Sequence, residues 1–70
     1  MDIAKAVRDA AKTKGLSQAD ICRATGMSDS YMSQLFNGRI PDPKASSVYK
    51  IAHALDMTVD ELLELAEIAQ

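Results

Sequence analysis

A mostly polar segment, from Ser28 to Gln34, is the part of this chain best equipped for hydrogen-bonded recognition. The amide of Gln34 places a donor beside an acceptor, so it can form two parallel hydrogen bonds with a flat polar edge. Asp29 supplies acceptors alone, whereas the hydroxyls of Ser30 and Ser33 can donate or accept. Such groups suit the recognition of a hydrogen-bonding pattern better than the making or breaking of covalent bonds.

Catalytic and metal-binding chemistry has little to draw on. Cys22 is the one cysteine and His53 the one histidine, so no nucleophile–base set and no metal-ligand cluster can be assembled from them. The pattern predicts an inert, buried thiol at Cys22 and an exposed imidazole at His53. We expect no enzymatic activity, no cofactor and no small-molecule ligand.

Length and composition predict one small all-α domain covering residues 1–70. Apolar residues make up 47% of the chain and are mostly Ala, Leu, Ile and Met, which favour helices over strands. A single cysteine excludes an internal disulfide, and neither a signal peptide nor a membrane-length apolar run of about 18 residues is visible. We therefore expect a cytoplasmic protein with no membrane association.

Charge is distributed unevenly along the chain. The net charge is −2, but residues 1–55 hold all eight Lys and Arg against five acidic residues, a balance of +3. Residues 56–70 hold five acidic residues and no basic one, a balance of −5. Because the acidic surplus is confined to the C-terminal segment, the rest of the chain keeps a small positive excess for a polyanionic partner.

Capping and turn residues divide the chain into five predicted helices, at about residues 2–14, 18–25, 29–36, 44–55 and 59–69. Asp2 can cap the first helix, and Thr58 with Glu61 forms a capping box at the fifth. For the fourth helix, Asp42 is the predicted cap and Pro43 the first residue. The segment NGRIPDP before it is a loop, because prolines and Asn-Gly interrupt regular structure.

The second and third predicted helices meet across a tight turn. Ser17 is a strong cap with Asp20 at the capping-box position, and Gly26 supplies the positive φ at which the backbone reverses. Ser28 then caps the third helix. This spacing predicts a helix-turn-helix, a unit whose second helix can enter the major groove of DNA.

From about Ile3 to Leu65 the chain resembles the DNA-binding domains of lambda repressor and Cro, the lambda-repressor-like group also called the XRE family. The motifs LSQADICRATGMS, SQLFNG and VYKIAHALDMTVDELL carry the resemblance. The chain departs from the family pattern at Cys22, where alanine is usual. Its predicted recognition face also has no Arg or Lys, so it cannot make the common paired contact to guanine O6 and N7.

The resemblance implies roles for individual residues. Phosphate or sugar-phosphate contacts fall to Gln18, Asn37, Arg39 and Lys44, although Arg39 and Lys44 also have an ordinary interpretation as solvated charges. The positions that match the groove-facing positions of the family are Ser28, Asp29, Ser30, Ser33 and Gln34. With Tyr31, added because of its place on the same helix, they are expected to contact bases.

Side-chain chemistry gives some of these positions a more specific expectation. Gln34 can bond adenine N6 and N7, a contact worth about 1–3 kcal/mol of base discrimination. Asp29 has two interpretations with equal support: it accepts from cytosine N4, or it stabilises the first turn of its helix. Tyr31 is either half-buried packing or an exposed contact to a phosphate or a thymine methyl group, and we favour the contact.

A single helix-turn-helix reads a short half-site, so such proteins usually bind palindromes as dimers. Leu65 and Ile68 lie off the predicted inward face of the last helix, and Ile40 lies in the loop. We expect these three residues to form a homodimer interface, although isolated apolar residues on a surface are also ordinary.

Together these observations predict a sequence-specific regulator of transcription that binds double-stranded DNA, most simply a repressor of phage or mobile-element type acting on a palindromic operator. The alternative is a protein-partner module, as in antitoxins with this fold, that docks a partner on its acidic C-terminal helix. The sequence leaves open the operator, the sign of regulation, and whether the chain is complete or part of a longer repressor.

Overall fold

The computed structural model describes residues 1–68, which contain five α-helices and no strand. The helices are α1 (Ile3–Lys14), α2 (Gln18–Thr25), α3 (Asp29–Phe36), α4 (Ala45–Ala54) and α5 (Val59–Ile68). The all-α, five-helix fold expected from the sequence is therefore confirmed. The predicted end of the last helix, at residue 69, lies outside the described residues.

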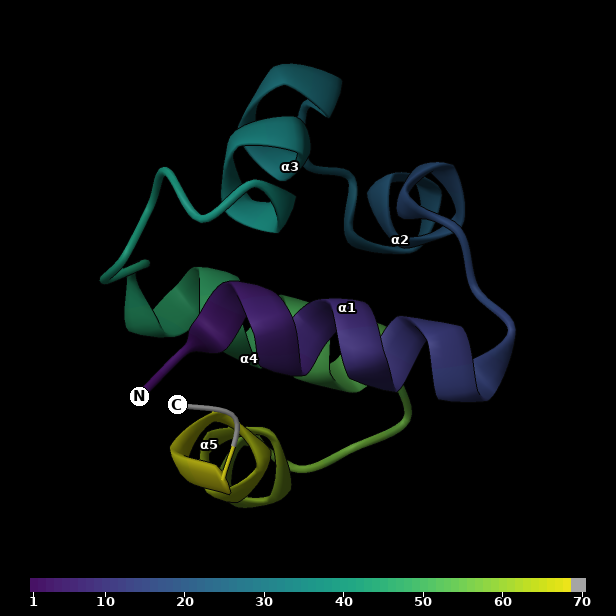
Figure 1. Cartoon of the computed structure of the whole chain (residues 1–70). Coiled ribbons are helices and arrows are strands. Elements are labelled where there is room, and N and C mark those ends of the chain that lie inside the picture. Colours follow the sequence, from purple (N-terminus) through teal and green to yellow (C-terminus); the bar gives the residue numbers. More distant parts are fainter. Residues whose placement is uncertain (69–70) are drawn as a thin grey trace.

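The helices are arranged around α1 and α4, which occupy the middle of the molecule (Figure 1). α2 and α3 pack against each other, α3 also packs on α1, and α2 also packs on α4. α5 packs on α1 and α4 from the other side (Figure 1). A backbone hydrogen bond of 3.0 Å from the N–H of Asp2 to the carbonyl of Ala66 ties the start of the chain to α5. The helix-turn-helix and α5 thus lie on opposite faces.

All five helices contribute to one apolar core. Its largest fully buried side chains are Val7, Ile21, Met32, Leu35, Ile51, Leu55 and Leu62. Cys22 is buried in this core, as expected. None of the described helices is both long enough and apolar enough to cross a bilayer.

Side-chain caps fix where the helices begin, much as the sequence indicates. The backbone N–H of Asp20 donates to Ser17 Oγ (3.1 Å), and that of Ser17 donates to Asp20 Oδ2 (2.8 Å). Thr58 and Glu61 form the same reciprocal pair at α5, at 3.1 and 2.8 Å. These backbone hydrogen bonds favour the ionised carboxyls, so the pKa values of Asp20 and Glu61 are lowered.

The prediction for the start of α4 was wrong. The helix begins at Ala45, its N-cap residue is Lys44, and no side chain bonds the cap. Lys44 has an extended backbone (φ −60°, ψ 148°), so Pro43 lies outside the helix and Asp42 does not cap it. Asp42 precedes Pro43 and is therefore restricted to extended conformations, but a capping residue is extended as well, so the difference lies at Lys44. Because Lys44 keeps the extended path of the loop, the helix begins two residues after the expected start.

Candidate nucleic-acid interface

The turn between α2 and α3 is held by backbone geometry and one threonine. Gly26 has a φ of +73°, a conformation that costs residues with a Cβ, and its N–H donates to the carbonyl of Cys22 at 2.9 Å. The hydroxyl of Thr25 donates to the carbonyl of Ile21 at 2.8 Å and accepts from the N–H of Met27 at 3.2 Å. These contacts set the angle at which α3 leaves the turn.

Two contacts fix α3 on the rest of the domain. Met32 and Leu35 point into the core and are fully buried. At the other end of the helix, the guanidinium of Arg8 donates a hydrogen bond to the carbonyl of Phe36. A cation at the C-terminus of a helix satisfies a free carbonyl and interacts favourably with the helix dipole. This role of Arg8 was not predictable from the sequence, because a contact between residues 28 positions apart leaves no local pattern.

The outward face of α3 carries the predicted base-reading residues. Asp29, Ser30 and Gln34 are exposed on it, and so is Ser28 at its start, whereas Ser33 is half-buried. The Gln34 amide donates to the hydroxyl of Ser30 at 3.4 Å, a long hydrogen bond that a base edge could replace at little cost.

The thiol of Cys22, in α2, lies close to the carboxylate of Asp29. Burial raises the pKa of the Cys22 thiol, and the Asp29 carboxylate close to it raises that pKa further. The thiol therefore stays protonated and unreactive near neutral pH, as predicted. Asp29 itself remains exposed at the first turn of α3, so both expectations for it, cytosine contact and helix stabilisation, stay open.

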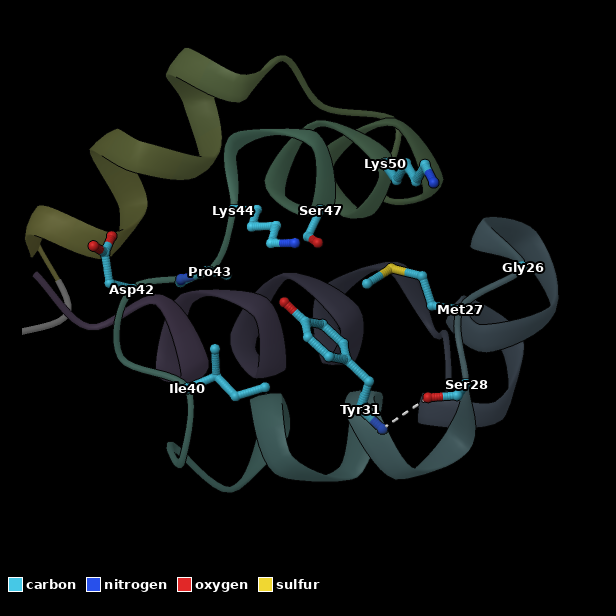
Figure 2. Close-up of a pocket in the computed structure, with 10 residues that line it drawn as sticks. All are labelled: Gly26, Met27, Ser28, Tyr31, Ile40, Asp42, Pro43, Lys44, Ser47 and Lys50. Atoms are coloured by element: carbon cyan, nitrogen blue, oxygen red, sulfur yellow. Dashed lines mark hydrogen bonds between the residues drawn. The ribbon is translucent and has the colours of Figure 1, made fainter.

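Tyr31 is half-buried, not exposed as favoured from the sequence. Its side chain lies on the flank of α3 that faces α4, where it lines a cavity of about 540 Å³ between the start of α3, the loop and the start of α4 (Figure 2). The loop residue Ile40, the α4 N-cap residue Lys44, and Ser47 and Lys50 of α4 line the same cavity. Tyr31 thus faces sideways from the surface that carries Ser30 and Gln34.

The predicted phosphate-contacting residues lie before and after α3 in the chain. Gln18 is the first residue of α2 and is half-buried, whereas Asn37, Arg39 and Lys44 are exposed between α3 and α4. The Asn37 amide lies 3.5 Å from the hydroxyl of Ser33. Polar or basic residues thus lie in the elements that precede and follow α3 in the chain, as the prediction of phosphate contacts requires.

The predicted dimer residues do not form one surface patch in the monomer. Ile68 is 80% exposed, but Leu65 and Ile40 are half-buried and pack against the core. Leu65 lines a cleft with residues of α1, whereas Ile40 lines the cavity beside Tyr31. The expectation that Leu65 points away from the core was wrong, because α1 extends far enough along α5 to cover its side.

The fold and the arrangement of α2, Gly26 and α3 define a DNA-binding helix-turn-helix protein. The family model for the helix-turn-helix domain matches residues 2–65, so the chain belongs to this family. The resemblance noted in the sequence is thereby confirmed.

Two relatives agree with that class. The chain is 37% identical over 60 residues to the "ImmF control region 10 kDa protein" of Bacillus phage phi105, covering 84% of this chain and 67% of the phage protein. It superposes with a TM-score of 0.88 on the clp gene regulator ClgR from C. glutamicum, at 25% identity, over 99% of this chain and 88% of that one. Family and relatives together support a DNA-binding transcriptional regulator.

Proposed function

We propose that this protein is a sequence-specific repressor of phage or mobile-element type that binds a palindromic operator as a dimer. The observation that carries the proposal is the exposed polar face of α3, held by buried Met32 and Leu35 on one side and flanked by the predicted phosphate contacts. Similarity to a control-region protein of a Bacillus phage supports the phage-type assignment. Repression follows if the operator overlaps a promoter and the bound protein blocks it.

Within this proposal, Gln34 is the main base-reading residue. It is exposed and lies one turn beyond Ser30 on the outward face of α3. The amide suits adenine, and the face lacks the Arg or Lys that would favour guanine. We therefore expect each half-site to contain an A·T pair opposite Gln34.

The test is selection from a random DNA pool at a fixed, stated salt concentration, with the wild type and with Gln34→Ala. The proposal predicts an enriched inverted repeat in which Gln34→Ala relaxes one base pair per half-site and leaves the others unchanged. Asn37→Ala is the comparison, since loss of a phosphate contact weakens all sequences about equally. If no sequence is enriched, the repressor assignment is wrong.

Dimerisation is the second part of the proposal. Ile68 is the large apolar side chain most exposed among the described residues, and a partner copy could cover it. Ile68→Ser should weaken binding to the full operator much more than binding to a single half-site, while the melting temperature stays the same. Because Leu65 is half-buried, a change there would disturb the fold as well. If the ratio of the two affinities is the same as in wild type, Ile68 does not belong to the interface.

A protein-partner module is the second candidate, favoured by the carboxylates along α5. Asp60, Glu61 and Glu64 are exposed there, on the opposite side of the molecule from α3 (Figure 1). A basic partner would suit this face. The same selection experiment separates the two candidates, because a partner module need not enrich any DNA sequence.

A further inference from the structure

The C-terminal end of α3 rests on α1 at two points that are one helical turn apart. The guanidinium of Arg8 donates a hydrogen bond to the carbonyl of Phe36. Four residues earlier on the same face of α1, the buried side chain of Ala4 lies beside Gly38, because a Cβ added to that glycine would be 3.9 Å from the Cβ of Ala4. The small residues let the two segments approach closely, and the arginine holds the end of α3 in that place.

The backbone of α3 ends in a way that leaves one carbonyl for a donor from another helix. The N–H groups of Gly38 and Arg39 donate to the carbonyls of Leu35 and Gln34, at 3.1 and 2.9 Å. With the φ of +74° at Gly38, these two bonds form a Schellman motif. Within residues 1–68, the carbonyl of Phe36 accepts from no backbone N–H, so the guanidinium from α1 completes the cap.

The charges around Arg8 favour this contact over any contact within α1. Lys5 lies three residues before Arg8 and Lys12 lies four residues after it, and like charges at such spacings destabilise a helix. Lys5 already pairs with Asp9, at 2.9 Å. The sequence of α3 contains no basic residue. Arg8 therefore supplies the cation that the C-terminus of α3 lacks, at a position where it does little for its own helix.

The end of α3 carries two kinds of predicted DNA contact. Gln34, the main predicted base-reading residue, lies two residues before Phe36, and the predicted backbone contacts Asn37 and Arg39 follow it. A side chain that reads a base must be held to within about 0.5 Å of its productive position. A change in the tilt of α3 would therefore remove the base contact, while Gln18 in α2 could still meet a phosphate.

We propose that Arg8 is a positioning residue for sequence-specific DNA binding, an assignment that rests on the proposed DNA-binding function. Its bond to the carbonyl of Phe36 fixes the tilt of α3, so that Gln34 meets a base edge when the backbone contacts are made. Arg8 acts through α3 and need not touch DNA. Its loss should lower the affinity for the operator more than the affinity for unrelated DNA, because phosphate contacts carry no sequence information.

Lys12 provides a matched control on the same helix. It lies one turn beyond Arg8, is exposed, and its ammonium forms no hydrogen bond or ion pair within the described part of the chain. Arg8→Met and Lys12→Met each remove one positive charge from α1. The bond to the carbonyl of Phe36 is lost only in the first of them.

The experiment measures the dissociation constants of both variants on the selected operator and on an unrelated duplex, over a range of salt concentrations. We expect Arg8→Met to weaken binding to the operator about thirtyfold and binding to the unrelated duplex less than about threefold, so that the ratio of the two affinities falls about tenfold. Lys12→Met should leave that ratio unchanged. The slope of log K against log salt should be the same for both variants, since neither removes a phosphate contact.

Amide hydrogen exchange of the free protein gives a second measurement that does not involve DNA. Arg8 is exposed, so Arg8→Met should stay folded, with exchange accelerated at Gly38 and Arg39 more than in the core helices. If Arg8→Met unfolds at the assay temperature, Arg8→Lys takes its place, because it keeps the charge but loses the planar fork of donors. The affinity ratio should then fall about threefold.

The same measurements can overturn the assignment. Equal affinity ratios for the two methionine variants, or unchanged exchange at Gly38 and Arg39, would show that Arg8 does not position α3, and would leave the DNA-binding function intact. Equal losses on both duplexes, with a salt slope lower by about one for Arg8→Met alone, would make Arg8 a phosphate contact. A wild-type protein that enriches no DNA sequence would overturn the proposed function itself.

Discussion

α3 and α5 are short helices of similar construction with very different surfaces. Each begins at a hydroxyl cap, Ser28 or Thr58, and each is anchored by a fully buried leucine, Leu35 or Leu62. They lie on opposite sides of α1 and α4 (Figure 1). The outward face of α3 carries mostly neutral amide and hydroxyl groups, whereas that of α5 carries carboxylates.

This difference indicates why a fold with two similar helices on its surface would bind DNA through only one of them. DNA carries one negative charge per about 1.7 Å of its axis, so a row of carboxylates excludes it. The outward face of α3 carries one carboxylate, Asp29, among neutral groups, so it repels DNA less than the face of α5 does, but it adds no general attraction. Binding should therefore depend on the surrounding cations for approach and on α3 for sequence.

The largest effects should come from removing the buried anchors of the two helices. Leu35→Ala and Leu62→Ala should each lower the free energy of unfolding by about 2–5 kcal/mol, measured by urea denaturation, because each leaves a cavity in a small core. Operator affinity should separate them, since only Leu35 supports α3. The milder Leu35→Met and Leu62→Met variants keep the protein folded for that comparison. Equal losses of affinity would mean that α3 has no special role.

A charge placed on α3 should have the next largest effect. Ser30→Glu would add a second carboxylate to the α3 face, beside Asp29, and like-charge contact with DNA should lower operator affinity about a hundredfold. Glu64→Gln, which changes the charge on α5 by the same amount, should alter affinity less than about threefold, because that surface charge is screened at a distance. Fluorescence anisotropy at one salt concentration measures both. A larger effect at Glu64 would contradict the division between the faces.

Substitutions in the turns that precede the two helices should change the stability of the protein in opposite directions. Gly26 has a φ of +73° before α3, and Asp56 has a φ of +57° before α5. Gly26→Ala should cost about 1 kcal/mol, because a Cβ is unfavourable in this conformation. Asp56→Gly should stabilise by about a few tenths of a kcal/mol, since relief of strain is partly offset by a more flexible unfolded chain. Thermal melts measure both changes in stability. A stabilised Gly26→Ala or a destabilised Asp56→Gly would contradict the prediction.

The smallest effect should appear at acid pH. The backbone hydrogen bonds of Ser17 and Thr58 lower the pKa values of Asp20 and Glu61 in the folded protein. Their contribution to stability is therefore present above the ordinary carboxyl pKa of about 4 and is lost as the pH falls through the lowered values. Urea midpoints should fall between about pH 5 and pH 3, and less so for Asp20→Asn and Glu61→Gln. If the urea midpoints of both variants fall with pH as steeply as that of the wild type, other carboxyls cause the loss of stability at acid pH.

Local features of the fold were predictable from the sequence, because each depends on residues close together in the chain. The cap at Ser17, the turn at Gly26 and the box at Thr58 are examples. The start of α4 was not predictable in the same way. A cap and a following proline are a common helix start, but here the extended path of the loop continues through Lys44.

In the candidate site, too, only the local features were predictable from the sequence. The outward residues of α3 follow from its helical period, so the exposure of Ser30 and Gln34 could be predicted. The bond from Arg8 to Phe36 and the cavity around Tyr31 depend on how helices distant in sequence pack together. A single sequence contains no direct signal for such contacts, and Leu65 was misplaced for that reason.

The most direct test of the division between the two faces is amide chemical-shift mapping on a duplex that carries one half-site of the selected operator. A single half-site binds one copy, so contacts between copies do not contribute. We expect shifts at the start of α2, along α3 and at the start of α4, with α5 unchanged. Shifts along α5 with α3 unchanged would contradict the account, because DNA would then occupy the acidic face.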